Sequence, residues 1–271
     1  MNNHGMSNAL IYAVSKIRVI FDNGNPAECM ENNGTGFFIL REDKEYFITN
    51  RHVLDPEKTE GIAGKGYKMQ TIYIDLRNYD EATKTPLSEE LFVKSCNYKF
   101  ADNNFDDIAC ISDIVYDKKP TVIRTNIDIK LLATADLFQS SFTICDTLAF
   151  IGFPSNQYDL LHNLPIVRSG IISSDPRVNF AINGTDKGNA IAYEVFSTGG
   201  SSGSPVFALQ KGFKLGPGLE GPDDFFRPLK LIGINAGHTK DPKTGTHSQL
   251  SYFYRSDMIL ALIEKVASGQ P

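Results

Sequence analysis

Short apolar runs separated by polar turns recur along this 271-residue chain, and they constrain its fold more than any other feature. In the first half they last only a few residues each, as at 37–40, 45–49, 71–76 and 108–111. Runs this short, with almost no helical period between them, are typical of β-strands. The pattern therefore predicts an all-β barrel.

A second series of apolar runs fills the C-terminal half, at 147–154, 166–172, 190–195, 205–209 and 229–234. Between the two series, residues 117–140 hold Pro120 and mixed charges with no clear period, so we place the crossing between two lobes there. We predict an N-terminal lobe over 10–125 and a C-terminal lobe over 140–255, which together form a single unit of 1–271.

The period changes near the end of the chain. From Ser256 onward the apolar residues recur at helical spacing, which predicts an amphipathic helix over 256–267. We expect Ser256 to cap the N-terminus of this helix, because a serine side chain can accept from the free N–H groups there. Met258, Leu262 and Val266 are expected to lie on one face of it, flanked by Ile259 and Ile263.

Composition narrows the possible functions. A net charge of −5 opposes a binding surface for nucleic-acid backbone, and four cysteines without a C-x-x-C pair oppose a zinc site. We expect no cofactor, no metal and no nucleic-acid partner. The sequence has no apolar run of membrane-spanning length and no signal-peptide pattern. We therefore expect no membrane partner, and a soluble protein of the reducing cytoplasm.

One stretch carries a chemical signal: residues 198–205, which read TGGSSGSP. Glycine reaches backbone angles that are closed to other residues, so Gly199 and Gly200 can turn successive N–H groups into one small space. Pro205 then starts a strand without needing a donor. A serine in such a turn stands beside backbone donors, as acyl transfer requires. The alternative is an ordinary Ser/Gly-rich loop between two strands.

A serine hydroxyl needs a base, and the base needs a carboxylate that orients it. Of the five histidines, only His52 directly follows a predicted strand pair. Asp107 opens the apolar run 108–111, so its carboxylate is expected at the edge of a buried strand, and adjacent Asp106 is the competing candidate. A structural histidine and an ordinary strand-end acid are the alternatives for these positions.

The three signals occur in the order His, Asp, Ser, which is the chymotrypsin order rather than that of subtilisins or α/β-hydrolases. Four segments resemble those of trypsin-like peptidases. They are the histidine segment at 34–39 with 47–52, the Asp-Ile-Ala segment at 106–109, the Gly-x-Ser-Gly-[Gly/Ser]-Pro signature at 200–205 and the pocket strand at 231–237. The resemblance is closest to bacterial peptidases of the glutamyl-endopeptidase and high-temperature-requirement types.

This resemblance implies a chymotrypsin-like fold of two six-stranded antiparallel β-barrels with the site in the cleft between them. It implies catalytic roles for His52, Asp107 and Ser202, and it selects Asp107 over Asp106. The backbone N–H groups of Gly200 and Ser202 would form the oxyanion hole. The chain is then expected to be a serine endopeptidase acting on protein or peptide substrates. The alternative is a protein-interaction module with a latent or vestigial peptidase site.

The chain also departs from relatives of this kind. Ser201 stands where zymogen-type members carry the aspartate that pairs with a newly cut N-terminus, so activation by that ion pair is not expected. The substrate-binding residues implied by the resemblance are Phe196, Asn235, Ala236 and Gly237. None of them is charged, and a charged P1 side chain would be buried there without a partner. We therefore expect an uncharged P1 residue.

Restraint of such an enzyme is expected from narrow specificity or from a regulatory protein partner. Gly199 and Gly200 favour a mobile oxyanion loop, and a partner that binds only the ordered form would shift its population. The Gly- and Pro-rich segment 212–228, with Phe225 and Phe226 beside two aspartates, is the predicted docking surface. A plain solvent loop is the alternative.

Overall fold

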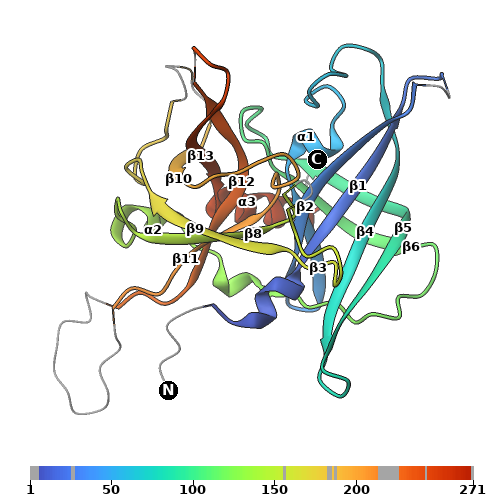
Figure 1. The fold of residues 1–271 in the computed structure, drawn as a ribbon, viewed down its shortest axis with the longest axis horizontal. Helices are drawn as coiled ribbons and strands as arrows, with labels where there is room; N and C mark the ends of the chain where they lie inside the picture. The colour runs from blue at the N-terminus through green and yellow to red at the C-terminus, as the bar shows by residue number, and fades with distance from the viewer. Residues whose placement is uncertain are drawn as a thin grey trace.

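The strands of the first half close into a barrel in the computed structural model (Figure 1). They are β1 (Val14–Asp22), β2 (Met30–Arg41), β3 (Lys44–Thr49), β4 (Lys68–Asp80), β5 (Thr85–Phe100) and β6 (Ala109–Tyr116). Their order is β1-β4-β5-β6-β3-β2, and pairing of β1 with β2 completes the ring. The structure describes residues 6–25, 28–154, 157–181, 185, 188–212, 226–241 and 243–269.

The C-terminal half forms a second closed barrel. Its strands are β8 (Thr147–Gly152), β9 (Ile166–Ile172), β10 (Ala190–Glu194), β11 (Pro205–Ala208), β12 (Lys230–Lys240) and β13 (His247–Arg255). They follow the order β10-β13-β12-β11-β8-β9, and every pairing among them is antiparallel. The two barrels lie side by side in Figure 1. The predicted chymotrypsin-like fold of two six-stranded antiparallel β-barrels is therefore confirmed.

Short elements connect and flank the barrels. A 3-10 helix, η1 (Asn8–Ala13), precedes β1, and one helical turn, α1 (Arg51–Leu54), follows β3. The crossing between the lobes carries β7 (Ile127–Asp128), which pairs in parallel with β2, and then η3 (Ile129–Leu131) and α2 (Ala135–Ser140). The region without a clear period in the sequence is thus a series of short elements.

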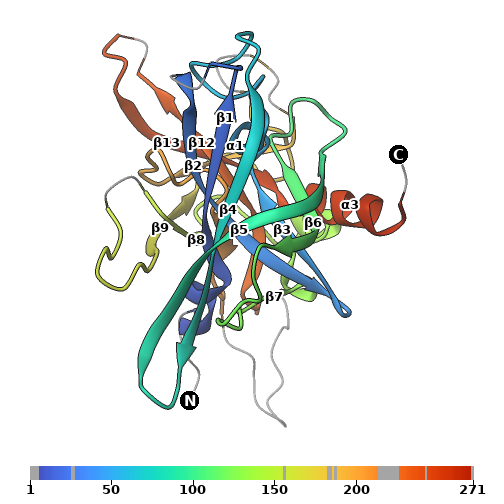
Figure 2. The same ribbon diagram turned by 90° about the vertical axis from the view of Figure 1, so that its right-hand side faces the viewer.

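The chain ends in helix α3 (Ser256–Ala267), which lies beside β6 in Figure 2. The prediction that Ser256 caps this helix is wrong. Arg255 occupies the N-cap, and Ser256 is the first helical residue. The Ser256 hydroxyl instead donates to the Ala133 carbonyl at 2.8 Å, so it ties the helix to the crossing between the barrels. Besides Ser256, the buried residues of the helix are Leu262 and the two flanking residues Ile259 and Ile263, while Met258 and Val266 are partly buried against the same apolar cluster.

Three apolar clusters hold the fold together. One fills the first barrel, where the rings of Phe38 and Phe47 pack edge to face with centroids 4.8 Å apart. A second fills the C-terminal barrel around Phe150 and Tyr193. The third contains residues of both barrels and of α3, for example Phe37 and Ile234. Because this shared cluster excludes water between the barrels, it fixes their relative position, which any site built from both barrels requires.

A buried ion pair adds a polar link between the barrels. Arg77 on β4 is fully buried, and its Nη2 lies 2.8 Å from Asp75 Oδ2. Its Nε donates to the Asn163 carbonyl at 3.0 Å, on the β8–β9 connection of the other barrel. Its guanidinium carbon also lies 4.2 Å from the ring centre of Phe153. Arg77 lies three residues before the end of β4 and pairs with Ser88 of β5, in the hairpin whose far end projects as a narrow arm in Figure 2.

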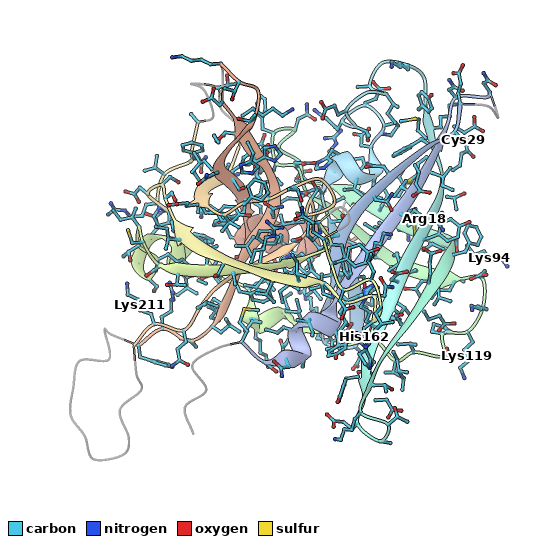
Figure 3. All side chains as sticks on the ribbon, viewed as in Figure 1. Arg18, Cys29, Lys94, Lys119, His162 and Lys211 are labelled. Carbon is cyan, nitrogen blue, oxygen red and sulfur yellow. The ribbon has the colours of Figure 1, made fainter. Side chains whose placement is uncertain are left out.

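Charged side chains cover the outside of the first barrel. Arg18, labelled in Figure 3, pairs with Glu90 at 2.7 Å, and its guanidinium carbon lies 3.9 Å from the ring centre of Tyr73. Such a partly exposed pair stabilises the barrel weakly, because water screens it. Within the described ranges, no helix is both long enough and apolar enough to cross a membrane.

Candidate active site

Strand β3 and helix α1 place His52 at the end of the first barrel. The chain leaves β3 at Thr49, turns at Asn50 and enters α1 with His52 in its single turn. Asn50 is the N-cap of α1, but its side chain makes no capping bond. Its amide donates instead to the Asp107 backbone carbonyl at 2.6 Å. The segment that carries the histidine is therefore tied to the segment that carries the aspartate.

Asp107 holds His52 at two points. Its Oδ2 lies 2.5 Å from His52 Nδ1, and its Oδ1 accepts the His52 backbone N–H at 2.8 Å. Both side chains are about a quarter exposed, at 27% and 22%. A carboxylate on Nδ1 keeps the proton on that nitrogen, so Nε2 is left as the acceptor that a general base needs.

Asp106, the competing candidate, faces the other way. Its side chain is buried, at 1% exposure for the residue, and it accepts from the Asn189 backbone N–H at 2.7 Å and from the Asn189 side chain at 2.9 Å. Asn189 lies directly before β10 of the second barrel. Asp106 therefore links the two barrels, while Asp107 beside it meets the histidine.

The electrostatic setting of His52 suits a base. Burial alone lowers the pKa of His52, but the charge of Asp107 and the hydrogen bond to it together raise that pKa above its ordinary value of 6.5. Two tyrosines of β13 lie close enough to sense the same carboxylate. Burial first and the charge of Asp107 second raise the pKa of both Tyr252 and Tyr254. These phenols therefore stay neutral beside the pair.

The serine segment forms a tight turn. The Ser201 N–H donates to the Thr198 carbonyl at 3.0 Å, and Gly200 at the third position of the turn has a φ of 83°. A positive φ at that position defines a type II turn and favours glycine. Within the described part of the chain, neither the Gly200 nor the Ser202 backbone N–H has a protein acceptor. The two residues that the resemblance assigns to the oxyanion hole therefore have unpaired backbone donors within the described residues.

Strand β2 supports both halves of the site. The Thr35 N–H donates to the Ser202 carbonyl at 2.8 Å, and the Asn32 side chain donates to the His52 carbonyl at 3.1 Å. Gly34 lies between them, where an added Cβ would be 2.9 Å from Val53 Cγ2 and 3.4 Å from the Ser202 carbonyl oxygen. The base and the serine therefore approach the same few residues of one strand, although they come from different barrels.

The side chains of Ser202 and His52 are separate among the described residues. Among the described residues, no hydrogen bond connects the Ser202 hydroxyl to the His52 ring. Resting peptidase sites often hold this pair loosely and close it when substrate binds. The structure thus pairs His52 with Asp107, and strand β2 contacts both the His52 segment and the Ser202 segment.

The predicted pocket residues differ in how far they are exposed to solvent. Phe196 is 45% exposed, whereas Ala236 on β12 is only 6% exposed and Gly237 packs against the Tyr252 hydroxyl. Asn235 is buried at 1% exposure, and both ends of its amide are bonded inside the protein. Its side chain lies under the serine turn rather than on a substrate surface, which differs from its predicted pocket-lining role.

Sequence reasoning missed three side chains beside Phe196. The His247 ring lies 4.6 Å from the Phe196 ring, His238 stacks on His247 at 4.1 Å, and Arg168 Nη1 donates to the Phe196 carbonyl at 2.8 Å. Burial is the main cause that lowers the pKa of both histidines. One signal was present, because His238 directly follows the predicted pocket strand 231–237. Within the described ranges, no group of His, Cys, Asp and Glu could hold a metal ion.

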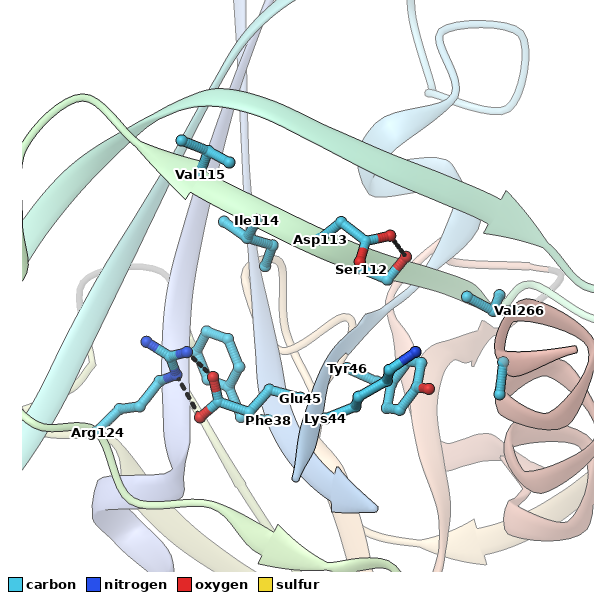
Figure 4. A pocket seen from close by; sticks show the side chains of 11 residues that line it. Phe38, Lys44, Glu45, Tyr46, Ser112, Asp113, Ile114, Val115, Arg124 and Val266 are labelled. Carbon is cyan, nitrogen blue, oxygen red and sulfur yellow. Dashed lines mark hydrogen bonds and ion pairs between the residues drawn. The ribbon is translucent and has the colours of Figure 1, made fainter. Parts of the chain in front are cut away.

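A cavity of about 400 Å³ lies elsewhere, on the first barrel (Figure 4). It opens where β3 and β6 diverge, because their pairing covers only Phe47–Thr49 and ends at Ile111. Asp113 on β6, with a φ of 52°, turns that strand away from β3. The cavity is lined by Glu45 and Arg124, which form an ion pair, and includes none of the predicted site residues. It results from strand geometry and has no part in the candidate site.

The predicted docking segment falls mostly outside the described residues, because 213–225 are not among them. Its two ends are described. Lys211 and Arg227 pair in an isolated bridge, and both contact Asp146, at 2.9 Å and 2.6 Å. The segment therefore leaves and returns at one anchored point, while the prediction about Phe225 stays a prediction.

Comparison with known proteins agrees with this geometry. The chain matches the trypsin-like peptidase domain over residues 34–216, which contain His52, Asp107 and Ser202. The chain therefore belongs to the trypsin-like peptidase family and is a serine peptidase. No match was found among curated proteins.

Solved structures with the same fold include proteases of the HtrA type. The crystal structure of Deg5 is 16% identical with a TM-score of 0.52, and the match covers 94% of this chain and 89% of that one. The HtrA-type protease AlgW with a decapeptide is 16% identical with a TM-score of 0.53, over 96% of this chain and 67% of that one. In the structure of AlgW with a tripeptide, the match covers 63% of the AlgW chain. At this identity the likeness establishes the fold.

Proposed function

We propose that this serine peptidase is an endopeptidase in which Ser202, His52 and Asp107 form the catalytic triad. The observation that carries the proposal is the pair of contacts from the Asp107 carboxylate to the His52 ring and to the His52 backbone N–H. These contacts fix the tautomer and the orientation of the ring. The nearby turn that holds Ser202 has free backbone donors within the described residues. A histidine with an ordinary structural role does not need this arrangement.

In the proposed reaction, His52 Nε2 removes the proton of the Ser202 hydroxyl as the oxygen attacks the scissile carbonyl carbon. The backbone N–H groups of Gly200 and Ser202 stabilise the charge that develops on the carbonyl oxygen. His52 then gives the proton to the leaving amine, which leaves an acyl-enzyme on Ser202. A water molecule, deprotonated by the same nitrogen, hydrolyses that ester and frees the carboxylic acid. Asp107 stabilises the imidazolium in both halves.

We propose a substrate with an uncharged P1 residue, in agreement with the expectation from the sequence. Phe196 offers an exposed ring, and the stacked pair His238 and His247 beside it is neutral at pH 7 because their pKa values are lowered. Two of the Arg168 guanidinium nitrogens already donate inside the protein, to the Phe196 carbonyl at 2.8 Å and to Gln157 at 2.6 Å. Specificity of this kind, rather than a regulatory partner, is the restraint that these contacts favour.

We also propose a reducing compartment such as the cytoplasm. All four cysteines are free, and burial raises the pKa of the Cys110 thiol to about 12. Such a thiol is unreactive and serves as a small apolar side chain in the core. Unpaired cysteines suit a reducing environment.

The test is cleavage of an unfolded protein substrate by the parent and by three variants. Ser202→Ala and His52→Ala should each lower turnover by up to about 10⁶-fold, as loss of a triad member does in other peptidases. Ser140→Ala, in exposed helix α2, is the matched serine control and should cleave like the parent. If the parent binds the substrate but none of the proteins cleaves it, the interaction module with a vestigial site is the better account.

A further inference from the structure

Three successive carbonyl groups of the serine turn are held by residues outside it. The Gly200 carbonyl accepts from the Thr35 hydroxyl at 2.7 Å, and the Ser202 carbonyl accepts from the Thr35 backbone N–H at 2.8 Å. Between them, the Ser201 carbonyl accepts from the Asn235 side chain at 2.8 Å. Of the three, the Ser201 carbonyl belongs to the peptide that carries the free Ser202 N–H.

We propose that Thr35 and Asn235 are positioning residues. In the resting protein they hold the serine turn in the conformation that leaves the Gly200 and Ser202 N–H groups free for an oxyanion, and they do so in place of an activating ion pair. The inference rests on the proposed function, because it concerns the same site. It also replaces the expectation of a mobile loop that waits for a partner.

Asn235 acts on the Ser202 donor directly. In a trans peptide the carbonyl and the N–H point in opposite directions, so the peptide between Ser201 and Ser202 is oriented by whatever binds its carbonyl. Asn235 binds that carbonyl with Nδ2, and its Oδ1 accepts from the Tyr193 hydroxyl at 2.6 Å. Tyr193 is fully buried, which raises its pKa well above the ordinary value and keeps it a donor. The amide therefore has a single orientation.

The Asn235 backbone forms hydrogen bonds to the residues that follow Ser202 in the same loop. Its N–H donates to the Ser204 carbonyl at 2.8 Å, and its carbonyl accepts from the Gly203 N–H at 2.9 Å. With the side-chain bond to Ser201, one residue of β12 makes three hydrogen bonds to the loop around the nucleophile. Rotation of the Ser201–Ser202 peptide would leave a buried amide and a buried carbonyl unpaired, and each such group costs about 1–3 kcal/mol.

Thr35 acts on the Gly200 side of the turn. It is fully buried, and its hydroxyl oxygen accepts the Phe153 N–H at 3.1 Å. A hydroxyl has one hydrogen, so that oxygen donates to the Gly200 carbonyl. Thr35 is itself fixed, because its carbonyl accepts from Thr49 Oγ1 at 2.8 Å. The peptide that follows Gly200 is thus held from β2, and the backbone of Gly200 is held with it.

The Ser201 side chain, at the position where zymogen-type peptidases carry the activating aspartate, does not help to hold the turn. Ser201 is fully buried, and its hydroxyl has no hydrogen-bond partner among the described residues. Its backbone, by contrast, is bonded at both ends, to Thr198 and to Asn235. The turn is therefore held through backbone carbonyls, and no charge beneath it is required.

The test compares Thr35→Val with Thr35→Ser in the full chain. Valine keeps the shape of threonine without its hydroxyl, and serine keeps the hydroxyl. Thr35→Val should lower kcat about 10–100-fold on a small peptide with little change in KM, since loss of a full oxyanion donor costs about 10²–10³-fold. Thr35→Ser should recover most of that loss. Affinity for a peptide aldehyde, which forms a tetrahedral adduct, should fall in Thr35→Val by the same factor as kcat/KM.

Asn235→Leu tests the second contact, and Thr83→Val at the exposed β4–β5 turn is the control for threonine replacement. Hydrogen exchange of the peptide covering 198–205 should quicken in Asn235→Leu and in Thr35→Val, and stay unchanged in Thr83→Val. Equal kcat in Thr35→Val and the parent, or equal loss in Thr35→Val and Thr35→Ser, overturns the inference. A parent that cleaves nothing overturns the proposed function instead, and the exchange rates then judge the inference alone.

Discussion

The buried ion pair between Asp75 and Arg77 makes a strong prediction about stability. Replacing Arg77 by methionine keeps a long flexible side chain over the Phe153 ring but removes the charge. The Asp75 carboxylate, whose side chain is 6% exposed, then loses its only cation within the described residues. Removing one partner of a buried pair costs about 3–5 kcal/mol, because the other charge stays desolvated.

The structure places the cost at the lower end of that range. Asn163 still donates to Asp75 Oδ2 at 3.1 Å in the variant, so the carboxylate keeps one hydrogen bond. We therefore expect Arg77→Met to lower the free energy of unfolding by about 3 kcal/mol. For a protein of this size that corresponds to a fall in Tm of roughly 6–12 °C.

Urea unfolding followed by far-ultraviolet circular dichroism is the assay, because the chain has no tryptophan. The double variant Asp75→Asn with Arg77→Met removes the orphaned charge and should recover most of the loss. Arg177→Met breaks the exposed pair with Asp175 and should change little. If Arg77→Met unfolds within about 1 kcal/mol of the parent, or the double variant is no more stable than the single one, the reasoning is refuted.

Three further predictions concern the site. Because Asp107 raises the pKa of His52, kcat/KM in a pH-rate profile should fall as the pH drops through a value above 6.5. Asp107→Asn should move that midpoint to lower pH and lower turnover by about 10⁴-fold. Gly203→Ala should abolish cleavage and reduce soluble yield, since Gly203 has a φ of 90° and its new Cβ would overlap the Thr35 carbonyl oxygen; normal activity would contradict this. Ser201→Ala should leave urea stability equal or higher, because the lost hydroxyl is buried without a partner.

Motifs predicted the parts of the site that depend on local chemistry. His52 follows a strand pair, Asp107 opens a buried run, and Ser202 sits in a glycine turn. The resemblance to trypsin-like peptidases was still needed to select Asp107 over Asp106 and to assign the nucleophile's role to Ser202. The short apolar runs predicted an all-β chain in two lobes, and the two six-stranded barrels were implied by the resemblance. Strand β13 was not predicted, because its first residues, from His247 to Gln249, are polar and give no apolar run.

What the sequence did not reveal depends on contacts between distant residues. Thr35 is 165 positions from Gly200, and no local pattern predicts that its hydroxyl meets that carbonyl. The same holds for Asn235, which was expected in the pocket and lies under the turn, 34 positions from Ser201. Local glycine content therefore overstated the freedom of the turn, since tertiary hydrogen bonds restrict it.

The most direct test of the triad is reaction with a fluorophosphonate, which phosphonylates a serine that is activated by a base and an oxyanion hole, with loss of fluoride. The folded parent should carry one phosphonyl group, located on Ser202 by peptide mass spectrometry, and neither the urea-unfolded parent nor His52→Ala should be labelled at a comparable rate. A folded parent that stays unlabelled, or one labelled at another serine such as Ser204, would contradict the account.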